Sequence, residues 1–165
     1  LHHNLAPPVS RIRVDAAGLW ADAVQVEGPY GLSVKVLAPA DMLIHNAIHL
    51  FMNDELRGGL RDVVDFRDLF RHFVDTHADF EQRLLRRAEE FGCVRALFYA
   101  VTTAQRLVGL APSAAFCADL QGYAPSAPVR SLMGWLIDRL LALVPGMPAE
   151  VVLKTGRRTL LCCAS

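Results

Sequence analysis

The spacing of apolar residues along the chain changes near residue 38. Before that point, the region holds the β-favouring pieces RIRVD and LSVKVLA and is broken by turn-forming residues: Pro7, Pro8, Gly18, Gly28, Pro29 and Gly31. GLWADAVQV, between them, fits one helical turn. From Pro39 onward the apolar residues recur every three or four positions, which is typical of amphipathic helices. The pattern predicts a mainly α chain of the α+β class, with short N-terminal strands followed by a bundle of about five helices.

End signals give approximate limits for these five helices. Pro39 favours a helix start, Asp79 is expected to cap the third helix with Gln82 as its capping-box partner, and Gly92 is expected to end it. The predicted helices cover about residues 39–53, 56–74, 80–91, 94–109 and 128–143. The chain is accordingly divided into residues 1–38 with strands, a helical domain over 39–147, and a loosely ordered tail over 148–165.

Composition excludes several classes of partner. Lys+Arg and Asp+Glu both total 17, so no net charge attracts nucleic acid or an anionic membrane surface. Charged residues interrupt the longest apolar stretches, which predicts that nothing spans a membrane. The four cysteines have neither C-x-x-C spacing nor the density of a disulfide framework, which predicts reduced thiols and a cytoplasmic protein.

The stretch LIHNAIHLF carries the most suggestive chemistry. His45 and His49 are four residues apart, so a helix would place both rings on one face, as in the H-E-x-x-H metal site. Asn46 stands where that motif needs a glutamate as general base, which excludes a zincin protease. Motifs for a serine-nucleophile elbow and for Walker or Rossmann phosphate binding are also missing.

Two interpretations of the histidines remain open. In one, Asp62 and Asp65 on the next helix complete a divalent-metal site with them, as in a metal-dependent phosphohydrolase, although the His-Asp dipeptide of such enzymes is missing. In the other, the histidines flank an apolar stripe and are held by neighbouring polar groups. Arg61 also has two interpretations. It forms an i to i+4 ion pair with Asp65 at the surface, or it belongs with Asp62 to a buried polar network that orients the imidazoles.

Several segments together resemble the uncharacterised nucleotidyltransferase family of bacteria. They are LHHNLAP, VLAPADMLIHNAIHLF, LRGGLRDVVDFRDLFRHF and DFEQRLLRRAEEFGCVRALFYAVTTAQRLVG, which cover about residues 1–112. The resemblance rests on a spaced set of residues: His45, His49, Leu60, Arg61, Asp62, Asp65 and Gly92. It implies a polymerase-beta-type mixed sheet followed by a helical half, of which this chain would hold the end of the sheet and the helices.

The resemblance also implies the chemistry. Such enzymes hold Mg²⁺ and a nucleoside triphosphate (NTP) with a D-x-D pair after a Gly-Ser turn and a third carboxylate. Neither D-x-D nor Gly-Ser occurs in the 165 residues, and the first residue is Leu1, so the chain is expected to be a fragment whose catalytic carboxylates lie in a missing N-terminal portion. The fragment itself would be inactive and bind no cofactor. A small molecule or a protein would be the acceptor.

His45, His49, Arg61, Asp62 and Asp65 would then line the cleft or form a structural polar network, with no catalytic residue in the fragment. The alternatives are a phosphohydrolase-like domain with a metal on His45, His49, Asp62 and Asp65, and a non-enzymatic helical interaction module with an exposed apolar face.

Overall fold

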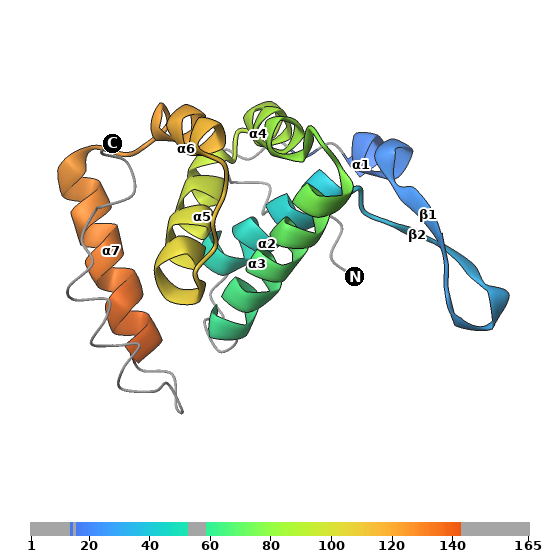
Figure 1. Cartoon of the computed structure of the whole chain (residues 1–165), viewed down its shortest axis with the longest axis horizontal. Coiled ribbons are helices and arrows are strands. Elements are labelled where there is room, and N and C mark those ends of the chain that lie inside the picture. Colours follow the sequence, from blue (N-terminus) through green and yellow to red (C-terminus); the bar gives the residue numbers. More distant parts are fainter. Residues whose placement is uncertain (1–13, 15, 53–58, 143–165) are drawn as a thin grey trace.

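The computed structural model describes residues 14, 16–52 and 59–142 (Figure 1). This part holds seven α-helices, one short 3₁₀ turn and a two-stranded antiparallel sheet, so the predicted class, mainly α within α+β, is confirmed. The elements are α1 Ala16–Asp22, β1 Val24–Glu27, β2 Ser33–Val36, α2 Pro39–Met52, α3 Gly59–Thr76, α4 Phe80–Glu90, α5 Val94–Val108, α6 Ala114–Gln121 and α7 Ala127–Ala142. The RIRVD piece, except Val14, and the tail from residue 148 lie outside the described residues.

The helical body is built around α5. This helix contacts α2 and α3, while α4 and α6 pack across the same body (Figure 1). Small side chains allow the close approach, since Ala100 and Ala104 of α5 are fully buried. The stripe predicted for residues 56–74 is confirmed: Val63, Phe66, Phe70 and Phe73 are buried, and Leu60 is half-buried. These apolar faces form one continuous core.

The β1–β2 hairpin projects from one end of this body, and α7 lies at the opposite end (Figure 1). The register pairs Val24 with Val36 and Val26 with Val34, which places four valines on one face of the hairpin. All but Val36 are exposed. At the turn, Tyr30 takes φ 66° and Gly31 φ 71°, a left-handed conformation that costs little only at glycine. VQVE was not predicted as a strand, and its structure comes from pairing with the predicted strand Ser33–Val36.

Two expectations about helices were wrong. About five helices were predicted, but the described part of the chain also contains α1, which is longer than one turn, and α6. The capping box at Asp79 does not form, because the Asp79 side chain makes no cap hydrogen bond and instead pairs with Arg83, Nε to Oδ1 at 3.2 Å. Gly92 does end α4: it takes φ 68°, and Gly92 N–H and Cys93 N–H donate to the carbonyls of Glu89 and Ala88.

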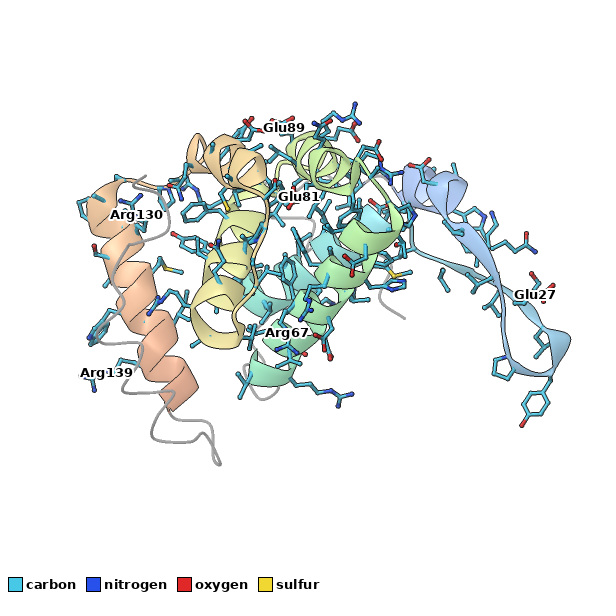
Figure 2. All side chains as sticks on the ribbon, in the orientation of Figure 1. Glu27, Arg67, Glu81, Glu89, Arg130 and Arg139 are labelled. Carbon is cyan, nitrogen blue, oxygen red and sulfur yellow. The ribbon has the colours of Figure 1, made fainter. Side chains whose placement is uncertain are left out.

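Ser113 joins α6 to α4. Its Oγ accepts from the backbone N–H of Phe116 at 3.1 Å, and its own N–H donates at 2.8 Å to Oε1 of Glu81, the residue labelled in Figure 2. Ser113→Ala is therefore expected to lower the free energy of unfolding by about 1 kcal/mol, the usual cost of losing an N-cap. Urea unfolding followed by circular dichroism measures this change. Ser113→Thr keeps a hydroxyl acceptor and is the control; equal stability of the two variants would contradict the capping role.

Candidate functional site

The two histidines of the LIHNAIHLF stretch lie on one side of α2. Their ring centroids are 4.3 Å apart, with the ring planes tilted by 56°. The four-residue spacing produces this contact, because positions i and i+4 of a helix lie one above the other. His45 is half-buried and His49 is exposed. Burial, with a smaller contribution from His49, lowers the pKa of His45 below its ordinary value of 6.5.

Arg61 and Asp65 face solvent on α3. Arg61 Nε lies 3.7 Å from Asp65 Oδ2, and their side chains are 86% and 52% exposed. The surface i to i+4 pair considered for Arg61 is therefore the arrangement in the structure, and such a pair stabilises a helix by only a few tenths of a kcal/mol. Asp62 is half-buried in the first turn of α3, where a carboxylate interacts favourably with the helix dipole.

The four-residue metal set is not assembled. Within residues 14, 16–52 and 59–142, no three His, Cys, Asp or Glu side chains come together closely enough to hold a metal ion. His45, His49, Asp62 and Asp65 thus do not converge, and the Asp65 carboxylate is paired with Arg61 at the surface instead. The phosphohydrolase interpretation lacks the ligand cluster that it requires.

The lowered pKa of His45 gives a testable pH dependence. Unfolded His45 binds a proton more readily than folded His45, so its contribution is complete above 6.5 and is lost as the pH falls below that value. The free energy of unfolding should therefore decrease between about pH 7.5 and pH 5.5, and His45→Gln should make the decrease shallower. Urea titrations at several pH values measure both slopes. An equally steep decrease in the variant would contradict this assignment.

A cluster of ion pairs around Arg87 is a feature that the sequence did not indicate. Arg87 of α4 donates to both carboxylate oxygens of Asp41 on α2, from Nε at 2.7 Å and from Nη2 at 3.1 Å. Nη2 also lies 2.7 Å from Asp22 Oδ2 at the end of α1, and Nη1 lies 3.1 Å from Glu90 Oε2. The guanidinium carbon is 4.4 Å from the Phe91 ring centroid. The hydrogen bonds that Arg87 donates to Asp41 and to Glu90, together with the negative charges of Asp41 and Asp22, raise the pKa of Arg87.

Burial distinguishes the three carboxylates. Asp41 is 1% exposed, whereas the side chains of Asp22 and Glu90 are 53% and 60% exposed. Asp41 lies in the first turn of α2 and holds α2 against α4 through a bidentate pair. A local pattern could not reveal this pair, because the two residues are 46 positions apart.

A hollow of about 330 Å³ lies beside this cluster, lined by Asp22, Ala38, Pro39, Ala40, Asp41, Phe80, Arg83 and Arg87. Asp22 and Asp41 are paired with Arg87, Arg83 is paired with Asp79 outside the hollow, and none of these lining residues carries a hydroxyl or a thiol. Cys93 is buried in the core, where burial raises the pKa of its thiol to about 12. A protonated thiol in an apolar core is unreactive, so it offers no nucleophile.

The model of the uncharacterised nucleotidyltransferase family matches residues 1–109. The chain belongs to this family. No curated protein and no solved structure matches the chain. The match includes α1 to α5, and with them the histidines, the acids of α3 and the Arg87 cluster, whereas α6 and α7 lie beyond it.

The nucleotidyltransferase resemblance implied Mg²⁺ on a nucleoside triphosphate, and the described residues do not form a site for that metal ion. Mg²⁺ bound to a triphosphate needs converging carboxylates, but the described acids do not form such a group, and buried Asp41 is neutralised by Arg87. Within the described residues, no helix is both long and apolar enough to cross a membrane.

Proposed function

We propose that this chain is the C-terminal helical part of a nucleotidyltransferase-like protein. The complete protein would transfer a nucleoside monophosphate from an NTP to an acceptor that is a small molecule or a protein hydroxyl. The family match over residues 1–109 supports this assignment. The helical body formed by α2 to α5 falls inside that match, so the matched region is predominantly scaffold.

The catalytic carboxylates would belong to an N-terminal portion of the same protein. The 165 residues contain no D-x-D pair and no Gly-Ser dipeptide, and the acids of the described helices are dispersed or paired with arginine. Stabilising a triphosphate electrostatically requires acids that hold its metal in fixed positions. The helical part would therefore support the catalytic sheet and contribute none of its metal ligands.

The histidine face of α2 would have its role at the junction between the two portions. His45 and His49 present two adjacent rings on α2, and Asp62 lies in the first turn of α3, the next helix. In the complete protein these residues, with Arg61 and Asp65, would brace the joint or line the acceptor side of the cleft. A bracing role fits half-buried His45, which neighbouring side chains keep away from full solvation.

Comparing two lengths of the protein tests this proposal. One is the 165-residue chain, and the other is a form extended at its N-terminus by the preceding codons of its gene. With Mg²⁺ and NTPs labelled on the α-phosphate, the extended form should label itself or an acceptor, and the 165-residue chain should not. Transfer by the shorter chain alone would overturn the proposal, as would an extended sequence without paired acids.

Metal analysis of the 165-residue chain distinguishes the phosphohydrolase alternative from the nucleotidyltransferase proposal. That alternative requires both a stoichiometric divalent metal and phosphatase activity, each lost in His49→Ala or Asp62→Ala. If the chain is instead the helical part of a nucleotidyltransferase, the two variants lower the free energy of unfolding and leave the metal content unchanged.

A non-enzymatic interaction module is the second candidate, and exposed apolar side chains on α7 favour it. Val129, Leu132 and Trp135 are 44%, 56% and 54% exposed, on a helix outside the family match. If this face binds a partner, Leu132→Glu should abolish the association without changing nucleotidyl transfer by the extended form. Sedimentation velocity measures association, and labelling from the α-phosphate of the NTP measures transfer.

A further inference from the structure

Helix α1 and the β1–β2 hairpin contact each other through Lys35 and Trp20. Lys35 of β2 lies over the Trp20 ring of α1, with Nζ 4.8 Å from the ring centroid, and Lys35 Nζ also donates to the Trp20 carbonyl at 3.4 Å. These contacts join two residues that are 15 positions apart in the sequence. We call α1 with the hairpin, residues 16–36, the arm.

The arm has few attachments to the helical body. Both strands of its hairpin are exposed on nearly every residue, and Figure 2 shows Glu27 on the hairpin, away from the helices. The apolar attachments lie at its base: Leu19 is buried in the core, and Val14 and Leu37 pack against it from either end of the arm. One polar attachment of the arm to the body is the ion pair of Asp22 with Arg87.

Arg87 stays in place whether or not Asp22 contacts it. The bidentate bond to buried Asp41 and the stack on Phe91 hold the guanidinium on the body. Asp22, by contrast, is half-exposed, and an exposed ion pair is weak and is screened by salt. The body therefore presents a fixed cation to which a weakly attached arm can bind and from which it can separate.

We propose that the arm is hinged at its base and that the Asp22–Arg87 contact is the latch that holds it closed on the helical body. Opening the arm would break this charge contact and loosen the apolar packing around Leu19. Local opening at so low a cost is typical of segments with few buried contacts. The proposal is independent of nucleotidyl transfer, since it concerns only contacts within the chain.

Two substitutions of matched exposure test the latch. Asp22→Asn and Glu90→Gln each remove one exposed carboxylate from the same guanidinium, but Asp22 belongs to the arm and Glu90 to α4 itself. In Asp22→Asn, amide hydrogen exchange in α1 should accelerate about two- to fivefold, while α3 and α5 keep their rates. Glu90→Gln should leave α1 at the parent rate. Salt at about 1 M should bring the parent close to the rate of Asp22→Asn and change the variant little.

Backbone ¹⁵N relaxation supplies a second readout. Order parameters of residues 24–36 should fall together in Asp22→Asn, with the Val24–Val36 and Val26–Val34 cross-strand contacts retained, because the arm would move as a unit. Three results would overturn the proposal: no change in Asp22→Asn, the same change in Glu90→Gln, or loss of the hairpin itself in Asp22→Asn.

Discussion

Asp41→Asn is expected to lower the free energy of unfolding by about 3–5 kcal/mol, the usual cost of removing one partner of a buried ion pair. The substitution removes the buried carboxylate from Arg87, whose side chain is only 20% exposed, and leaves it the half-exposed Asp22 and the exposed Glu90. It also weakens two charge-assisted bonds between α2 and α4. Urea unfolding at neutral pH, followed by circular dichroism, measures the change.

Glu90→Gln is the matched control for this prediction. It removes another carboxylate from Arg87, but one that is 60% exposed and belongs to the same helix, so a change within about 0.5 kcal/mol is expected. The double variant Asp41→Leu with Arg87→Met should recover part of the lost stability, because Arg87 is then no longer a partly buried charge that has lost its buried partner. Equal effects of Asp41→Asn and Glu90→Gln would show that burial does not decide the strength of this cluster.

The helices that the sequence predicted best are those with strong local signals. Pro39 and Gly92 mark ends that the structure confirms, and Gly109 ends α5 with φ 69°. The phenylalanines of α3 recur on one face and are buried there. In these segments, periodicity and end signals agree with tertiary packing, which is why local reasoning succeeds.

The errors arose where local signals compete or are short. Asp79 precedes a helix as a cap would, but its carboxylate pairs with Arg83 one turn later. Ser113 does cap a helix, yet α6 is only eight residues long and its apolar pattern is weak. A four-residue strand such as β1 exists because it pairs with β2, and its sequence does not favour a strand strongly enough by itself.

In the candidate site, too, contacts within one helix could be predicted and contacts between helices could not. Contacts within one helix follow from spacing, so the His45–His49 contact and the Arg61–Asp65 pair could be anticipated. Contacts between helices depend on how the helices cross. The Arg87–Asp41 pair therefore had no signal in either segment, and the convergence of Asp62 and Asp65 with the histidines, considered from spacing alone, did not occur.

Phe70→Ala is expected to lower the free energy of unfolding by about 3–5 kcal/mol, the range found for truncating a buried aromatic side chain. Phe70 is 2% exposed at the junction of α3, α4 and α6. Its ring centroid lies 6.3 Å from that of Phe66, 6.1 Å from Phe80 and 5.8 Å from Phe116. Truncation leaves a cavity among three rings that belong to three helices, so the packing of α6 on α3 should weaken as well.

Two further substitutions on α3 are controls for the effect of Phe70→Ala on stability. Val74→Ala lies one turn beyond Phe70, where the side chain is 38% exposed, and should change stability by no more than about 0.5 kcal/mol. Phe70→Leu keeps most of the apolar volume but loses the ring contacts, so it should fall between the two. Urea midpoints compare all three. If Phe70→Ala cost no more than Val74→Ala, the aromatic cluster could not be what holds α6 to the body, and the Glu81–Ser113 contacts would have to carry that junction.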